Sequence, residues 1–206
     1  FWFNHDPEPT IVQALEACDN LSEKLWKKMI WTDRGMDLLL TGRHRNGAVP
    51  AFSSWDFLRM LSFATRRYDS VIVDLPEVVE DVFGVIRERA DFKFIVCNPD
   101  RISATMARRR IDEMEAGGAE VKNLGIIVNK VGPKPLAKDK VEQIARRPVV
   151  LELPIDEDPN AEVSLLDTLL QRRSKIVKGY RKLAEAIDQQ VVSSRPPGMA
   201  KAAEEL

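Results

Sequence analysis

The stretch that decides the fold is Tyr68-Asp69-Ser70-Val71-Ile72-Val73-Asp74-Leu75-Pro76. Val71–Val73 is short, apolar and β-branched, which predicts a buried strand. Asp74 follows at its carboxyl end, and Pro76, which has no N–H to donate, ends the strand. Ligands of an open parallel sheet bind just beyond the carboxyl ends of strands, and an aspartate there can hold Mg²⁺ through water beside a nucleotide phosphate. Taken alone, this stretch supports two interpretations equally well. One is a strand that carries a Mg²⁺-binding aspartate, and the other is a buried strand whose aspartate caps the next helix.

Composition sets the broad class of the protein. The 206 residues suffice for one large domain with a buried core, and a net charge of −1 gives no overall basic field that would draw the chain to nucleic acid. Cys18 and Cys97 lie far apart in the sequence, which favours free thiols in a reducing cytoplasm. We find no apolar run long enough for a transmembrane segment, no signal peptide and no metal-ligand spacing around the two histidines. We therefore expect a cytoplasmic protein without structural zinc.

Strand patterns alternate with helix patterns along the chain. This order predicts an α/β fold with a mostly parallel sheet. We predict one domain over residues 1–192 and a flexible tail over residues 193–206, which contain Pro196, Pro197 and Gly198. The predicted strands cover residues 36–41, 71–73, 92–97, 124–128 and 149–153, and the predicted helices lie near residues 10–18, 21–30, 53–67, 78–89, 102–116, 140–145 and 175–191.

Four of the predicted strands end in polar or proline-containing segments. These segments begin at Asp74, at Asn98, at Asn129 and at Pro154. If the strands are parallel, all four segments meet at one edge of the sheet, where an α/β fold places its binding site. The Asn129 amide offers both a donor and an acceptor, which suits the edge of a purine base, although Asn129-Lys130 by itself is better explained as a simple strand-ending turn.

Together, these segments resemble the ParA/MinD family of deviant Walker A ATPases, and most closely its CpaE-like pilus-assembly branch. The resemblance covers about residues 1–190 and rests on the order of four motifs. It implies a P-loop NTPase-like fold with helices on both faces of a mostly parallel sheet. The motifs are Tyr68–Pro76, Asn98-Pro99-Asp100, Gly125-Ile126-Ile127-Val128-Asn129-Lys130 and Leu153-Pro154-Ile155-Asp156.

The resemblance implies a role for each matching position. Asp74 would be the catalytic Walker B acid, acting on Mg²⁺ through water, and residues 75–79 would form switch II. Asn129, with Lys130 beside it, would contact the adenine of ATP, and Pro154, Ile155 and Asp156 would line the base. ATP would promote a homodimer, and hydrolysis would release it.

The sequence departs from the family at the phosphate-binding loop. No segment of the Lys-Gly-Gly-x-Gly-Lys-Thr type is present, and the chain opens on Phe1-Trp2-Phe3 without an initiator methionine. We expect the first strand, the phosphate loop and the first helix of the family to precede Phe1. Without them this chain alone is not expected to hydrolyse ATP, because phosphoryl transfer depends on positioning and charge stabilisation. The alternative is a degenerate relative that keeps a scaffold role.

Three functional hypotheses follow from the resemblance. The first is a CpaE-like ATPase that localises or assembles a type IV or Flp (Tad) pilus, recruited to a cell pole or an inner-membrane complex. The second is a non-catalytic interaction scaffold, and the third is a DNA-partitioning ATPase. Arg108-Arg109-Arg110 could contact nucleic acid, but Asp112, Glu113 and Glu115 balance these charges and favour a solvated helix face.

Overall fold

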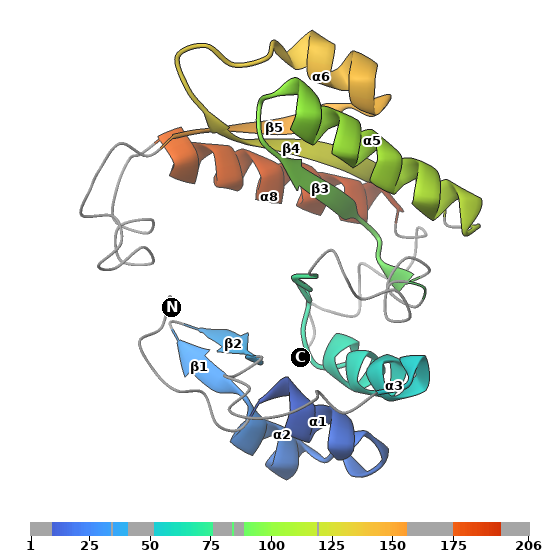
Figure 1. The fold of residues 1–206 in the computed structure, drawn as a ribbon. Helices are drawn as coiled ribbons and strands as arrows, with labels where there is room; N and C mark the ends of the chain where they lie inside the picture. The colour runs from blue at the N-terminus through green and yellow to red at the C-terminus, as the bar shows by residue number, and fades with distance from the viewer. Residues whose placement is uncertain are drawn as a thin grey trace, which may run out of the picture. The chain divides into compact units, whose positions relative to one another are not determined.

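A computed structural model describes residues 10–33, 35–40, 52–75, 84, 89–118, 120–155 and 175–194. The chain divides into two compact units, residues 1–89 and 90–206 (Figure 1). The expectation of one domain over residues 1–192 stays a prediction.

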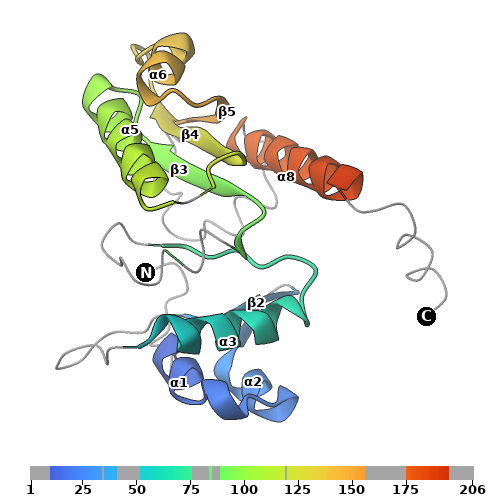
Figure 2. The ribbon, with the colours of Figure 1, turned by 90° about the vertical axis from the view of Figure 1, so that its right-hand side faces the viewer.

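The second unit is a three-layer α/β structure. Its parallel sheet has the strand order β3-β4-β5, with helices α5 and α6 on one face and helix α8 on the other (Figures 1 and 2). This arrangement confirms the predicted α/β fold with a parallel sheet between helical layers. The elements are β3 (Lys93–Cys97), α5 (Arg101–Ala116), β4 (Leu124–Val131), α6 (Lys138–Ala145), β5 (Val149–Pro154) and α8 (Lys175–Ser194).

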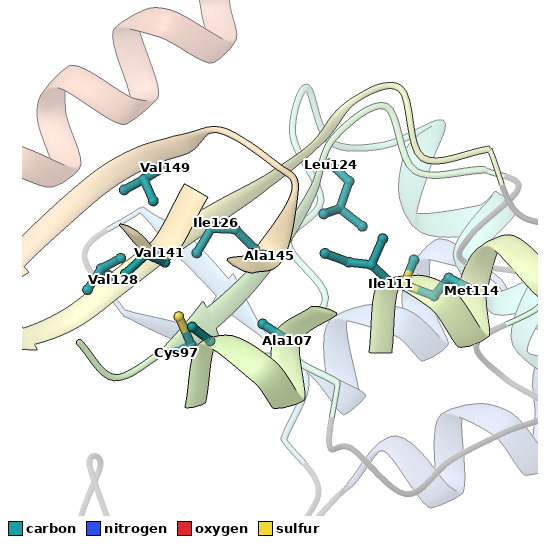
Figure 3. Close-up of a cluster of buried hydrophobic side chains, with 11 residues drawn as sticks. Cys97, Ala107, Ile111, Met114, Leu124, Ile126, Val128, Val141, Ala145 and Val149 are labelled. Atoms are coloured by element: carbon teal, nitrogen blue, oxygen red, sulfur yellow. The ribbon is translucent and has the colours of Figure 1, made fainter. Parts of the chain in front are cut away.

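The core of this unit follows from the alternation of side chains along β4. Ile126 and Val128 face α5 and α6 and are at most 1% exposed, whereas Ile127 faces the layer of α8. Burial of each such side chain contributes roughly 1.5–3 kcal/mol. Figure 3 shows the larger cluster, which comprises Cys97, Ala104, Ala107, Ile111, Met114, Leu124, Ile126, Val128, Val141, Ala145 and Val149.

Helix α8 extends further than the sequence predicts. It continues through Ser194, so that the first two residues of the predicted tail are helical, and residues 195–206 lie outside the described part of the chain. None of the described helices is long and apolar enough to cross a membrane.

The first unit packs three helices with a β-hairpin (Figure 1). Hydroxyl N-caps start its helices: Thr10 for α1, Ser22 for α2 and Ser53 for α3. The elements are α1 (Ile11–Glu16), a 3₁₀ turn η1 (Cys18–Asn20), α2 (Glu23–Met29), β1 (Trp31–Asp33), β2 (Met36–Leu38) and α3 (Ser54–Thr65).

The predicted strand over residues 36–41 is only partly correct. It forms as the three-residue strand β2, and β2 pairs antiparallel with β1, a strand that the sequence pattern did not reveal. Gly35 lies in the turn with φ +80, a conformation that favours glycine, and so allows the chain to reverse there. A tight antiparallel hairpin is a local structure, and it forms here in place of a longer parallel strand.

The prediction of a strand over Val71–Val73 is wrong. These residues have no strand assignment, and the Ile72 side chain is 94% exposed. A strand requires a neighbouring backbone with which to exchange N–H···O=C bonds, and no strand of the described residues pairs with this segment. The predicted helix over residues 78–89 lies almost entirely outside the described residues.

Gly179 controls how closely α8 approaches the sheet. A Cβ atom at this position would lie 3.1 Å from Leu153 Cδ2 and 3.2 Å from Leu151 Cδ1. We expect Gly179→Val to lower the free energy of unfolding by about 1–3 kcal/mol, because the added methyl groups overpack this contact. Urea denaturation followed by circular dichroism measures the change.

Glu185→Val is the matched control, since Glu185 lies on an exposed position of the same helix. It introduces the same β-branched side chain without the contact to β5 and should cost only about 0.5 kcal/mol in helix propensity. Equal losses in both variants would show that the close approach at Gly179 is not important.

Candidate functional site

The carboxyl ends of β3, β4 and β5 lie together at one edge of the sheet. Because the strands are parallel and adjacent, the segments that follow them come together there. The structure therefore brings together the Asn98-Pro99-Asp100 turn, Asn129-Lys130 and Pro154-Ile155. Asp156 lies outside the described residues, and Asp74 belongs to the other unit.

Asn129 and Lys130 form an irregular step in β4. The register with β5 shifts between Val128 and Val131, and pairing resumes where Val131 lies opposite Pro154. Lys130 has φ +58, in the left-handed region that costs a non-glycine residue about 1–2 kcal/mol. Strain of this kind concentrates at functional sites, and it marks this step as the most unusual backbone of the edge.

The Asn129 side chain is oriented by a local hydrogen bond. Its Oδ1 accepts the backbone N–H of Lys130 at 2.9 Å, and the residue is half-buried. This bond uses one acceptor position and leaves the NH₂ group and a second acceptor position. Asn129 can therefore still offer the donor and acceptor pair that a purine edge requires.

Hydrogen bonds also hold the neighbouring loops in place. The Leu136 N–H donates to the Pro99 carbonyl at 2.8 Å, which joins the loop after β4 to the turn after β3. Asp100 caps α5 by accepting the Ser103 N–H at 2.8 Å and the Ser103 hydroxyl at 2.7 Å. The backbone bond from Ser103, and then its hydroxyl, hold the pKa of Asp100 below the ordinary value of 3.8.

Cys97 lies directly before this turn and is buried. Burial, and then the negative charge of Asp100, raise the pKa of the thiol. A raised pKa keeps Cys97 protonated at neutral pH, so it is a core residue and not an activated nucleophile. The edge is thus better suited to holding a ligand than to forming a covalent intermediate with it.

Asp74 is an exposed carboxylate in the first unit. Mg²⁺ prefers oxygen ligands and is commonly held by one or two carboxylates together with substrate phosphates. The described residues contain no group of three or more His, Cys, Asp or Glu that could hold a metal ion by themselves. A Mg²⁺ ion at Asp74 would therefore need most of its oxygen ligands from water or from a bound phosphate group.

A polar network that the sequence did not reveal lies just before the Asp74 segment. The Trp26 indole N–H donates to the Tyr68 hydroxyl at 2.8 Å, and this hydroxyl donates to Asp37 Oδ2 at 2.6 Å. The Thr32 hydroxyl donates to Asp37 Oδ1 at 2.6 Å. These residues are distant in sequence, and the one local signal for them is the Gly35 turn, which places Thr32 opposite Asp37.

The network also affects the acidities of its members. The Thr32 hydroxyl, and then that of Tyr68, hold the pKa of Asp37 below its usual range. Burial, and then the hydrogen bond to Asp37, raise the pKa of Tyr68. At neutral pH, Asp37 is therefore an acceptor and Tyr68 a donor, as the network requires.

The arginine cluster on α5 is paired within its own helix. Arg109 and Arg110 contact Glu113 at 3.1 and 3.0 Å, and Arg108 pairs with Asp112. This pairing favours the solvated helix face over a nucleic-acid contact.

Comparison with solved structures shows which fold this is. The chain superimposes on a ParA family ATPase from Chlorobium tepidum TLS with a TM-score of 0.76 and 20% identity, covering 85% of this chain and 74% of that one. The chain has the ParA/MinD fold. MinD with Mg-ADP from Pyrococcus horikoshii OT3 matches with a TM-score of 0.66 and 16% identity, covering 91% and 76% of the two chains.

A MinC:MinD complex from Aquifex aeolicus gives a similar result. Its TM-score is 0.61 at 18% identity, with 89% of this chain and 74% of that chain covered. No family model matches the chain, and no curated protein matches its sequence. The likeness at these identities concerns the ParA/MinD fold, while activity and partners require arguments from the residues.

The lowered pKa of Asp100 makes the stability of the edge dependent on pH. A folded-state pKa below the unfolded value stabilises the protein above that value, and this stability is lost as pH falls through the folded pKa. We expect wild type to lose more thermal stability than Asp100→Asn between about pH 6 and about pH 3, because asparagine keeps the cap without titrating. Thermal melts of both proteins across this pH range test the prediction. Equal losses of melting temperature in wild type and Asp100→Asn would contradict it.

Proposed function

We propose that this protein is a ParA/MinD-type ATPase, which binds ATP with Mg²⁺ and uses hydrolysis to switch between association states. The observation that supports this most strongly is the fold itself, which the chain shares with a ParA family ATPase and with MinD in complex with Mg-ADP. The position of Asn129 at the carboxyl edge of the parallel sheet agrees with this proposal, since ligands of such sheets bind there.

In this proposal the protein's residues have distinct roles. Asn129 hydrogen-bonds the adenine edge, Lys130 lies beside it, and Pro154, Ile155 and Asp156 line the base. Asp74 holds Mg²⁺ through water. The metal would neutralise charge on the phosphates during transfer. The tests of these roles use the native full-length protein.

The wider role that we propose is that of a CpaE-like factor in the localisation or assembly of a type IV or Flp (Tad) pilus. The sequence order from Tyr68 to Asp156 supports this branch. ATP would favour a homodimer, and polar-localisation or pilus proteins would be the partners. The MinC:MinD complex shows that a protein of this fold can bind a protein partner.

The alternatives predict different behaviour. A scaffold on the same fold would bind its partner equally well with and without ATP. A DNA-partitioning ATPase would bind any duplex in a salt-sensitive manner, and the ion pairs of Arg108–Arg110 within α5 disfavour it.

Asp74→Ala tests the metal-binding role. We expect hydrolysis to fall at least about a hundredfold, because charge stabilisation by the metal contributes several kcal/mol to the transition state, and Mg²⁺-dependent dimerisation to weaken. Phosphate release and analytical ultracentrifugation measure the two effects. Asp69→Ala is the matched control, an exposed aspartate at the start of the same segment. Unchanged turnover in Asp74→Ala would remove its metal role.

Asn129→Ala tests the base-binding role. We expect ATP affinity to fall about tenfold at unchanged thermal stability, which corresponds to the loss of about one net hydrogen bond. Isothermal titration calorimetry measures the affinity. Asn123→Ala is the control, because Asn123 lies at the opposite end of β4, where its amide donates to the Asp91 carbonyl. Equal ATP affinity of Asn129→Ala and wild type would exclude Asn129 from the base site.

A further inference from the structure

We propose that Tyr68 is a positioning residue for Asp74, because it anchors the start of the segment that carries this carboxylate. The inference rests on the proposed function and names a residue that acts on Asp74 without touching the nucleotide. Tyr68 lies six positions before Asp74, so an extended chain between them spans at most about 20 Å.

Tyr68 is fixed by both its main chain and its side chain. Its N–H donates to the Ala64 carbonyl at 3.0 Å, which ties it to the last turn of α3. Its hydroxyl accepts from Trp26 at 2.8 Å and donates to Asp37 at 2.6 Å. A phenol has one proton to donate, so the Asp37 bond uses its donor and the Trp26 bond fixes an acceptor position. One orientation of the ring satisfies both partners.

The partners of this hydroxyl are themselves held firmly. Trp26 is 3% exposed and packs against Phe63 with ring centroids 5.2 Å apart. Asp37 is fixed by the cross-strand bond from Thr32 in the hairpin. Tyr68 therefore joins α2, α3 and the β1–β2 hairpin at one point.

Arg67 strengthens this junction from the other side. Its guanidinium lies 5.8 Å from the centre of the Tyr68 ring and pairs with Glu23 of α2 at 2.8 Å. A cation over an aromatic face is attracted by the negative potential of the ring. The chain is thus held at two consecutive residues, 67 and 68, at the end of α3.

The chain is far less constrained beyond this junction. Residues 71–75 belong to no helix or strand, and Val71, Ile72 and Asp74 are exposed. The position of Asp74 therefore depends on where the segment starts and in which direction it leaves. Groups that hydrogen-bond directly to a metal ligand commonly change metal affinity by about 10–100-fold when they are removed, and Tyr68 acts less directly, through the chain that leads to Asp74.

Tyr68→Phe in the native full-length protein tests this inference. The measurement is the affinity for a fluorescent ATP analogue, with and without Mg²⁺. We expect the gain in affinity caused by Mg²⁺ to shrink about tenfold, the lower end of that range, while the affinity without Mg²⁺ stays at the wild-type value. The matched control is Tyr180→Phe, because Tyr180 lies half-exposed on α8 in the other unit.

A purely structural role would give a different result. Loss of the hydroxyl leaves the buried Trp26 N–H without its partner, which lowers thermal stability whether or not Asp74 is affected. An unchanged Mg²⁺ response in a folded Tyr68→Phe variant would overturn the positioning role, as would an equal loss of affinity with and without Mg²⁺. If Tyr68→Phe does not fold, Asp37→Asn serves instead, since its amide oxygen still accepts from Tyr68 but without charge assistance.

The wild-type protein separates this inference from the proposed function. If wild type shows no Mg²⁺-dependent binding of the ATP analogue, the proposed function fails, and the role of Tyr68 fails with it. If wild type responds to Mg²⁺ and Tyr68→Phe responds equally, the ATPase proposal stands and only the positioning role is wrong.

Discussion

The parallel hydrogen bonding of β4 to both β3 and β5 is the constraint on which the second unit depends. It satisfies the backbone of a strand whose Ile126 and Val128 side chains are buried, and it places three strand ends at one edge. Burial of backbone N–H and C=O groups without hydrogen-bond partners would destabilise the fold by more than the burial of the β4 side chains stabilises it. The packing of α5, α6 and α8 follows, because each helix covers an apolar face that this pairing creates.

The candidate site lies at the carboxyl end of β4, where the regular pairing with β5 is interrupted. Lys130 adopts a left-handed conformation within the last residues of β4, and pairing resumes at Val131. The bonds of Val131 and Leu136 to neighbouring segments hold the loops around the strained step. A rigid sheet thus carries an irregular, half-exposed edge, an arrangement that suits ligand binding because the scaffold bears the strain.

The first unit is organised by polar contacts as much as by its apolar core. Trp26, Tyr68, Asp37 and Thr32 join segments that are distant in sequence, and each hydroxyl or carboxylate of the group has a partner. The contact of the buried Trp26 favours one arrangement, because a buried N–H without its partner is costly. Thr32 and Asp37 belong to a hairpin of which the sequence pattern predicted only the second strand.

The sequence by itself determined the α/β class, the strands around Phe94, Ile126 and Leu151, and the helix predicted over residues 102–116, because periodicity is a local property. It also predicted that Asn98, Asn129 and Pro154 would share an edge, which follows once the strands are parallel. Only the tertiary structure decided that Val71–Val73 forms no strand and leaves Ile72 exposed, that β2 pairs with β1, and that Tyr68 is bound to Asp37. Strand pairing and side-chain networks depend on partners remote in the chain, and no local pattern specifies which partner is present.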